Sequence, residues 1–257
     1  MPDLTKFLKR GVATISARTV PGLLHSIHIP TVQRRLMNGQ LMSLQTNSVL
    51  TNALWDERSF EPGVRAAIVS RCKPGMTVVD VGANVGYYTL QAAALVGPTG
   101  RVLAAEPNPS MVRQLESNLA LNGINNVTVA DIALSDQDGT ADFYFPETGC
   151  EAYGSLRPNS LFRAASHSPV RTETLGTCLE RLAFSSVDLI KLDVEGAELS
   201  VLRGAERVLA TMKPVLIFEA AELFSQAFGH TVFDTLSYLN GFGYTLTELE
   251  YGNWIAR

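Results

Sequence analysis

The sequence predicts an α/β fold in which helices cover both faces of a doubly wound, mostly parallel sheet. Between residues 60 and 240, short apolar runs alternate with longer stretches whose apolar residues recur at helical spacing. This alternation is typical of a parallel sheet, because each return to a parallel strand needs a crossover helix. Residues 244–250 and 253–256 form two short runs separated by two residues, which predicts an antiparallel hairpin at one edge.

Composition limits the classes of function. The 257 residues and the apolar content of 46% suit a single domain with a large core. The net charge of −4 argues against general nucleic-acid binding, which favours a basic surface. The cysteines Cys72, Cys150 and Cys178 are odd in number and include no Cys-x-x-Cys pair, so we expect free thiols and a cytoplasmic location. No apolar run reaches the length of a transmembrane segment.

Residues 1–55 differ from the remainder in charge and in pattern. They contain six basic residues and one acidic residue, Asp3. Their apolar spacing is weakly helical and is interrupted at Pro21 and Pro30, so we expect an N-terminal helical extension that packs over the domain. A surface role against anionic lipid is the alternative, which the short apolar face disfavours. Residues 56–257 form the predicted domain.

Glycine, proline and asparagine divide this domain into its elements. A helix opens at Phe60-Glu-Pro-Gly and ends at Lys73-Pro-Gly, and another begins at Asn108-Pro and ends at Asn122-Gly. The turn at residues 136–139 precedes a strand that returns along its predecessor. The expected strands are 77–81, 102–105, 127–134, 141–145, 170–175, 187–193 and 215–218, and the expected helices are 60–72, 87–96, 109–121, 177–184, 197–212 and 232–240.

The first strand leads into a glycine turn, TVVDVGANVGYYTL from Thr77, that has the form of a ligand-binding loop. Gly82 and Gly86 give the main chain freedom to turn and let a ligand approach the start of the helix. Asn84 stands where a dinucleotide fingerprint has its middle glycine. Glu106 ends the next strand, where an acid can accept hydrogen bonds from both hydroxyls of a ribose. A nucleoside therefore suits this turn better than a dinucleotide, and a turn that binds nothing is the alternative.

Together these motifs resemble the FkbM-type methyltransferases, which use S-adenosylmethionine (SAM). The matching stretches are Phe60-Glu-Pro, VVDVGANVGYYTL, Glu106-Pro-Asn-Pro, Ala133-Leu-Ser-Asp, Gly154-Ser-Leu and IKLDVEGAELSVLRGAE, over about residues 55–220. The resemblance implies the class I SAM methyltransferase fold, a Rossmann-like seven-stranded sheet whose last strand is antiparallel. It also implies O-methylation of a hydroxyl on a sugar, glycolipid or natural product.

Three further residues at strand ends are candidate SAM ligands. Asp80 is expected near the cationic methionine end of SAM, or else bonded to the N–H groups of the following helix. Asp131 and Ala133 follow the third strand, where adenine would lie. The Asp131 carboxylate would accept from the adenine amino group, or alternatively cap a turn.

Methyl transfer to a hydroxyl needs a proton acceptor, and the fourth long strand ends in the acidic sequence Asp-Val-Glu. Asp193 is the first candidate base, Glu195 the second and His230 the third. Lys191 lies on the same side of the strand as Asp193, which favours an ion pair between them. Asp193, Glu195 and Glu219 would hold a magnesium ion if the fold brought them together, but metal-free chemistry is the expectation.

Residues 146–168 form a long polar stretch, which is usual for a functional loop or a disordered segment. We expect a lid over the acceptor site. A SAM-dependent O-methyltransferase with a small-molecule or glycan acceptor is the favoured function. A non-catalytic SAM-binding protein is the first alternative, and an NAD-dependent oxidoreductase, which Asn84 argues against, is the second.

Overall fold

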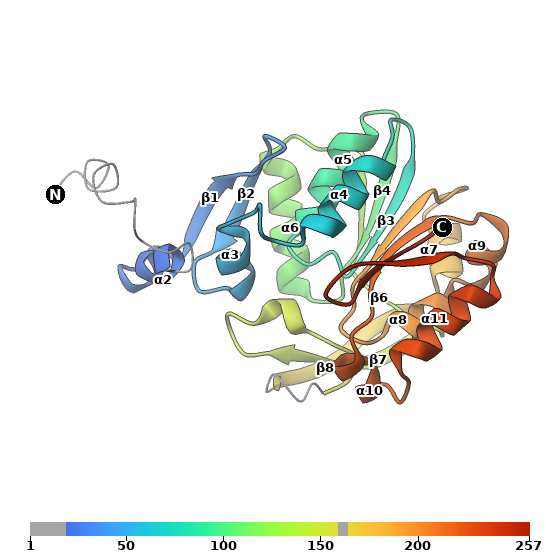
Figure 1. Cartoon of the computed structure of the whole chain (residues 1–257). Coiled ribbons are helices and arrows are strands. Elements are labelled where there is room, and N and C mark those ends of the chain that lie inside the picture. The colour runs from blue at the N-terminus through green and yellow to red at the C-terminus, as the bar shows by residue number, and fades with distance from the viewer. Residues whose placement is uncertain (1–18, 159–163) are drawn as a thin grey trace.

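The computed structural model describes residues 19–158 and 164–257, and its centre is a seven-stranded sheet (Figure 1). Five neighbouring strands run parallel, and the two C-terminal strands complete one edge as an antiparallel hairpin. In spatial order the strands are β11 (Leu246–Glu250), β12 (Asn253–Ala256), β10 (Val215–Glu219), β9 (Leu189–Leu192), β3 (Thr77–Val81), β4 (Arg101–Ala105) and β5 (Val127–Ala130). The predicted doubly wound sheet with its antiparallel hairpin is therefore confirmed.

Helices cover both faces of this sheet, and each face has its own apolar core. Val78 packs into one core, whereas its neighbour Val79 packs into the other, because successive strand residues point to opposite faces. One core includes α4 (Pro62–Arg71), α5 (Tyr87–Val96) and α6 (Pro109–Leu121), and the other includes α7 (Leu175–Arg181), α8 (Glu198–Gly204), α9 (Glu206–Thr211) and α11 (Val232–Gly241). None of the helices in the described residues is long and apolar enough to cross a membrane.

The N-terminal region is not wholly helical, so the sequence prediction was wrong for residues 31–45. Between α2 (Thr19–Ser26) and α3 (Val49–Leu54), the strands β1 (Thr31–Arg35) and β2 (Leu41–Gln45) form an antiparallel hairpin. Met42 and Leu44 are buried and their neighbours are less so, which is a strand period that the helical interpretation missed. Ser43 between them donates its backbone N–H to Asn118 of α6 at 2.8 Å, which fixes the hairpin against the domain. Residues 1–18 of the predicted extension lie outside the described residues.

A second, three-stranded sheet replaces two of the predicted features. The run 127–134 is divided, because β6 (Ala133–Leu134) leaves the main sheet and pairs in parallel with β8 (Ala164–Glu173). The strand β7 (Gly139–Pro146) pairs with β8 and not with the run before it. The chain bends at residues 136–138, close to the predicted turn, but Gly139 already belongs to β7, and the partners of β7 lie 18 to 33 residues further along the chain.

The segment between β7 and β8 is shorter and better anchored than the sequence predicts. Residues 164–168 belong to β8, so the connection covers residues 147–163, of which 159–163 lie outside the described residues. It contains a short 3-10 helix, η1 (Glu151–Tyr153). Val49 donates its backbone N–H to the carbonyl oxygen of Gly149 at 2.7 Å, and the backbone of Tyr144 bonds that of Ser155 at 2.8 Å.

Two helical details also differ from the prediction. The predicted helix 197–212 is divided into α8 and α9 at Gly204, where a Cβ atom would collide with the backbone carbonyl of Ser135. This close approach requires glycine, and it packs the helix against the turn after β6. The short helix α10 (Glu222–Ala227), which the sequence interpretation missed, follows β10 directly.

Candidate active site

The turn between β3 and α5 is built around two glycines with positive φ angles, +78° at Gly82 and +93° at Gly86. A Cβ atom on Gly82 would collide with the backbone carbonyl oxygen of Asp193, and one on Gly86 would collide with the side chain of Leu115. The glycines therefore bring the end of β3 against the end of β9 and the start of α5 against α6. This is a packing role that the sequence interpretation, which emphasised the approach of a ligand, did not include.

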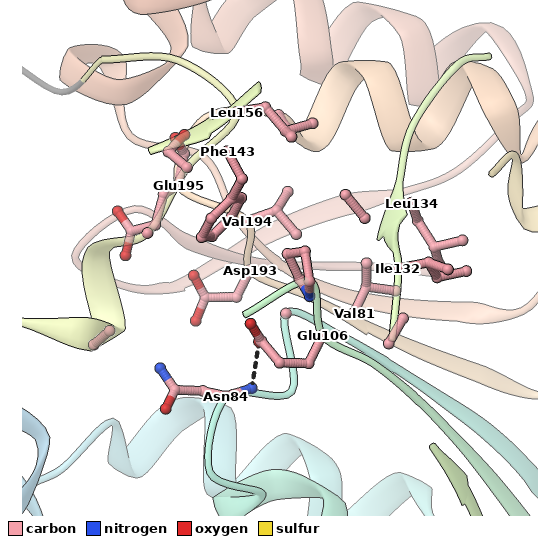
Figure 2. A pocket seen from close by; sticks show the side chains of 18 residues that line it. Val81, Asn84, Glu106, Ile132, Leu134, Phe143, Leu156, Asp193, Val194 and Glu195 are labelled. Atoms are coloured by element: carbon pink, nitrogen blue, oxygen red, sulfur yellow. Dashed lines mark hydrogen bonds between the residues drawn. The ribbon is translucent and has the colours of Figure 1, made fainter. Parts of the chain in front are cut away.

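Glu106 follows β4 and holds the glycine turn in shape (Figure 2). Its Oε2 accepts the backbone N–H of Asn84 at 2.8 Å, and its Oε1 accepts the backbone N–H of Asn108 at 2.8 Å. Glu106 is 6% exposed, and this burial raises its pKa to about 7 against the opposing effect of the two backbone donors. Each oxygen keeps a lone pair available, so the same carboxylate is still able to accept bonds from ligand hydroxyls.

A cavity beside Glu106 combines this carboxylate with apolar walls. We call it the Glu106 cavity (Figure 2). Ala133 lines it, whereas Asp131 does not and is exposed to solvent. An apolar slot next to a buried acceptor suits a flat base joined to a sugar that carries hydroxyls. Its apolar side chains include Val81, Ile132, Leu134, Phe143, Leu156 and Val194.

A larger cavity of about 580 Å³ adjoins the first, and we call it the Lys191 cavity. Its volume lies within the range usual for ligand pockets, roughly 300–1,000 Å³. Gly82 and Asn84 line both cavities, so one ligand could extend from one into the other around the glycine turn. The ionisable residues that line the Lys191 cavity, tyrosines aside, are Glu61, Asp80, Lys191, Asp193, Glu195 and Glu219.

Asp80 lies in the last part of β3 and is 2% exposed. Its Oδ2 accepts a hydrogen bond from Thr89 Oγ1 at 2.6 Å, and its Oδ1 has no partner within the described part of the chain. Burial raises the pKa of Asp80, and Lys191, its cross-strand neighbour on β9, opposes that effect. The Thr89 bond supports the alternative that Asp80 bonds the start of α5, while the free Oδ1 leaves an acceptor for a ligand.

Lys191 is the cation among the residues that line its cavity, and it is 6% exposed. Its Nζ lies 2.7 Å from Asp193 Oδ2 and 4.9 Å from the centre of the Tyr88 ring. Burial alone would lower the pKa of Lys191, but the carboxylates of Asp193, Asp80 and Glu61 raise it above its ordinary value. The ion pair predicted from the strand period is confirmed.

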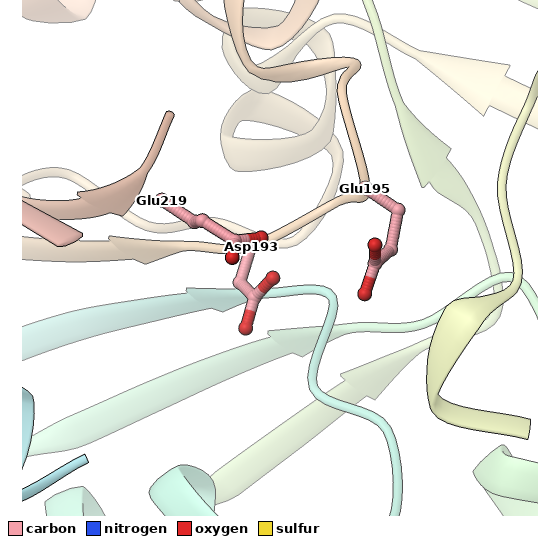
Figure 3. Close-up of side chains that lie close together, drawn as sticks. All are labelled: Asp193, Glu195 and Glu219. Atoms are coloured by element: carbon pink, nitrogen blue, oxygen red, sulfur yellow. The ribbon is translucent and has the colours of Figure 1, made fainter. Parts of the chain in front are cut away.

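Three carboxylates converge at the carboxyl ends of β9 and β10 (Figure 3). One oxygen each from Asp193, Glu195 and Glu219 lies within 4.8 Å of the others. Glu195 has a positive φ of +53°, and its buried Oε2 has no hydrogen-bond partner within residues 19–158 and 164–257. Burial, followed by repulsion from Asp193, raises the pKa of Glu195 well above its ordinary value and that of Glu219 to about 9.

The structure does not bring His230 into this group. His230 lines neither cavity, and its Nε2 lies 3.1 Å from the backbone carbonyl oxygen of Gly196. The ring thus contacts the outer side of the loop that carries Glu195. The sequence did not show that His230 lies outside the cavity, because the helix α10, which sets its position, was not predicted.

Sequence reasoning also missed two residues that line the Lys191 cavity. Glu61, at a positive φ of +41°, accepts a hydrogen bond from the Tyr88 hydroxyl, and burial raises its pKa. Its motif Phe60-Glu-Pro was recognised, but as the start of a helix and not as a source of a cavity carboxylate. Ala152 of η1 lines both cavities, so the segment after β7 lies over the junction between them.

The comparisons with known proteins agree with this geometry. A family model described as the methyltransferase FkbM domain matches residues 80–246, which is more than half of the chain. The methyltransferase sdnD of Sordaria araneosa is 30% identical over 156 residues, which are 50% of this chain and 60% of that protein. The 2-O-methyltransferase NoeI of Sinorhizobium fredii is 28% identical over 201 residues, which are 69% of this chain and 77% of that protein.

A solved structure supports the fold. The crystal structure of methyltransferase FkbM from Methylobacillus flagellatus superposes with a TM-score of 0.52 at 16% identity, over 81% of this chain and 54% of that one. The chain thus spans about six-tenths of sdnD and about half of this solved protein. At this identity the likeness concerns the fold, which is the class I Rossmann-like methyltransferase fold.

The residues present fit SAM as the cofactor. The Glu106 cavity offers an apolar slot and a carboxylate for the adenosine part, and the adjoining Lys191 cavity offers the free Asp80 oxygen and further carboxylates for the cationic part. The family match and this fit decide between the nucleoside cofactor and a nicotinamide dinucleotide. The chain belongs to the FkbM methyltransferase family and has the class I methyltransferase fold.

Proposed function

We propose that the protein transfers the methyl group of SAM to a hydroxyl oxygen of an acceptor bound in the Lys191 cavity. The observation that carries this proposal is the group of carboxylates, Asp193, Glu195 and Glu219, beside the glycine turn. A hydroxyl is a poor nucleophile while it keeps its proton, and a carboxylate within hydrogen-bond reach is able to accept that proton. SAM supplies a methyl group already activated by its sulfonium, so positioning and proton removal are what the protein must add.

The roles of the cofactor residues follow from their places. Glu106 would accept bonds from the ribose hydroxyls while it continues to hold Asn84 and Asn108. Ala133 and its apolar neighbours would contact the adenine, and the free Oδ1 of Asp80 would face the cationic end. Asp131 is exposed outside the cavity, which favours its alternative as a turn residue.

Two carboxylates share the proposed catalytic role. Asp193 is held by Lys191 through Oδ2, which fixes its orientation and leaves Oδ1 to face the acceptor. Glu195 keeps a buried Oε2 without a donor, and it would act as a second proton acceptor in its ionised form, which its raised pKa disfavours relative to the protonated form. One of these carboxylates would take the hydroxyl proton as the acceptor oxygen receives the methyl group, and the sulfur of the bound cofactor would leave as a neutral thioether.

The class of acceptor is supported by charge and by the named relative. Five carboxyl groups and one ammonium line the cavity, which therefore lacks the cluster of cations that a polyanion such as nucleic acid needs. The relative NoeI is named a 2-O-methyltransferase, which supports oxygen as the acceptor atom. A hydroxyl on a sugar, glycolipid or other natural product fits both observations. Cys72, Cys150 and Cys178 are all free, which supports a reducing compartment such as the cytoplasm.

Methyl-labelled SAM tests the proposal directly. The protein is incubated with methyl-labelled SAM and with fractionated metabolites of its host, and labelled products are identified by mass spectrometry. Nuclear magnetic resonance then assigns the labelled carbon to an oxygen, a nitrogen or a carbon atom. A product labelled on oxygen supports the proposal, and a product labelled only on nitrogen or carbon rejects it. Glu106→Ala, which weakens the proposed ribose contacts, serves as the low-activity control.

A further inference from the structure

The three carboxyl groups at the ends of β9 and β10 outnumber the one ammonium group that bonds them. Asp193, Glu195 and Glu219 each bring an oxygen within 4.8 Å of the other two, and Lys191 bonds Asp193 alone (Figure 3). When all three carboxylates are ionised, one ammonium leaves two negative charges at one place. Figure 3 shows Asp193 and Glu195 on the segment that follows β9, and Glu219 at the end of β10.

Buried carboxylate oxygens without partners also indicate a missing positive ligand. The buried Oε2 of Glu195, one of the three cluster residues, has no hydrogen-bond partner in the described part of the chain. Asp80, which is 2% exposed and lines the same cavity, has an Oδ1 without a partner in the same part of the chain, and the cationic end of SAM is the proposed partner of that oxygen. Buried acceptors are almost always satisfied in native proteins, so exceptions need an explanation such as an unseen ion or ligand.

We propose that Asp193, Glu195 and Glu219 bind one divalent cation of the magnesium or manganese class. Such ions prefer carboxylate oxygens, and they leave positions in their coordination sphere for water and substrate oxygens. A single ion is within reach of all three side chains, because oxygens around one such cation lie roughly 3–4 Å apart and these oxygens are within 4.8 Å of one another. A divalent charge also balances the two negative charges that Lys191 leaves when all three carboxylates are ionised as ligands.

The proposed cation deepens the proposed function and rests on it for its catalytic role. A cation at the ends of β9 and β10 would lie in the cavity that receives the acceptor. An acceptor hydroxyl bound to the cation would lose its proton more readily, and a cluster carboxylate would take that proton. The favoured acceptors are then those with two neighbouring oxygens, such as a vicinal diol, which bind one ion together.

Binding of manganese to the SAM-free full-length chain tests the site itself. Free Mn²⁺ is measured by electron paramagnetic resonance during a titration, and Mg²⁺ is then added as a competitor. We expect one bound ion per chain, and we expect Glu219→Gln to weaken binding by about tenfold or more through the loss of one charged ligand. Glu116→Gln is the matched control, because Glu116 is an exposed residue of α6, and it should bind as the wild type does.

Stability separates a lost ligand from a damaged fold. In EDTA, Glu219→Gln should unfold at the same temperature as the wild type or higher, since glutamine keeps the shape of the side chain and cannot ionise beside the other carboxylates. Added Mg²⁺ should raise the unfolding temperature of the wild type and of Glu116→Gln, but not that of Glu219→Gln. No Mn²⁺ binding, or equal binding by Glu219→Gln and wild type, would overturn the proposed site.

Two measurements keep this inference distinguishable from the proposed function. SAM affinity is measured by calorimetry in EDTA. If SAM does not bind there, the result counts against the proposed function, whereas the manganese titration still decides the cation site by itself. If the oxygen-labelled product forms at the same rate in EDTA as in Mg²⁺, the catalytic role of the cation is rejected and the O-methyltransferase proposal stands. A product that forms only with the divalent ion supports both.

Discussion

The Nζ atom of Lys191 lies 2.7 Å from Oδ2 of Asp193, in a cavity whose other charged groups are carboxylates. Lys191 is buried, so its removal would leave Asp193 and Asp80 without their counter-charge. We expect Lys191→Met to lower the free energy of unfolding by roughly 3–5 kcal/mol, the usual cost of breaking a buried ion pair on one side. Urea unfolding in EDTA measures this.

Two further variants show whether the stability lost in Lys191→Met comes from the broken ion pair with Asp193. The double variant Lys191→Met with Asp193→Asn should recover part of the stability, because the unpaired charge is gone. Arg207→Met removes one partner of an exposed ion pair with Glu180 and should change stability by less than about 1 kcal/mol. Equal losses for Lys191→Met and Arg207→Met would contradict a structural role for the buried pair.

Glu106 should control SAM affinity. Glu106→Ala removes the acceptor of two backbone N–H groups and of the proposed ribose bonds. We expect SAM to bind more weakly by roughly 1.5–3 kcal/mol, the range for hydrogen bonds to a charged group. Calorimetry provides the affinity. Asp131→Ala is the control, because Asp131 is exposed outside the cavity and its removal should leave the affinity nearly unchanged. Similar losses in both variants would place the ribose site elsewhere.

The carboxyl group of Glu106 should also make the folding stability of the SAM-free protein depend on pH. Burial raises the pKa of Glu106 to about 7 from an ordinary value of 4.5, so the folded SAM-free protein binds this proton more tightly than the unfolded chain. The stabilising effect is complete below about pH 4.5 and is lost as the pH rises through 7. The SAM-free wild type should therefore lose stability over this window, more than Glu106→Gln does. Unfolding temperatures measured across the window give the comparison.

Ribose hydroxyls donate to the ionised carboxylate, so SAM binding near pH 6–7 should release a proton from Glu106 and weaken as the pH falls. Calorimetry in two buffers with different ionisation enthalpies detects this proton. Glu106→Gln should show a smaller dependence on the buffer. A binding enthalpy that is the same in both buffers for the wild type would mean that Glu106 is not the coupled group.

The segment of residues 147–158 should respond to ligands. Ala152 lines both cavities, and Ser155 Oγ donates to the backbone carbonyl of Glu195 at 3.0 Å, so this segment closes over the junction. Segments that must open for substrate entry have low local stability. We expect fast hydrogen exchange there in the free protein and slower exchange with SAM and acceptor. Amides of α6 serve as the reference, and equal protection in both states would contradict a lid.

The sequence reveals those parts of the site that lie close together along the chain. The glycine turn, Glu106 at the end of β4 and the parity of Lys191 with Asp193 depend on strand period and on short motifs. The convergence of Asp193, Glu195 and Glu219 was considered because parallel strands end at the same edge of a sheet. These features are local or follow directly from the fold class.

The remainder depends on contacts between distant segments. The bond from Tyr88 to Glu61 joins two helices, and the pairing of β6 with β8 joins residues almost 40 positions apart. The hairpin of β1 and β2 is stabilised by Asn118, whose side chain bonds the backbone of Ser43. Tertiary partners of this kind override weak local patterns, and the sequence of a single chain does not show them.

The most direct measurement of the proposed mechanism is the turnover of Asp193→Asn on the acceptor identified by the labelling experiment. This substitution keeps the shape of the side chain and removes its basic oxygen. We expect the SAM dissociation constant to stay nearly unchanged and turnover to fall by roughly 10²–10⁴, the usual contribution of general base catalysis. Glu195→Gln should also reduce turnover, and His230→Gln should leave it normal, since His230 lies outside the cavity. Normal turnover in both Asp193→Asn and Glu195→Gln would contradict proton removal by these carboxylates.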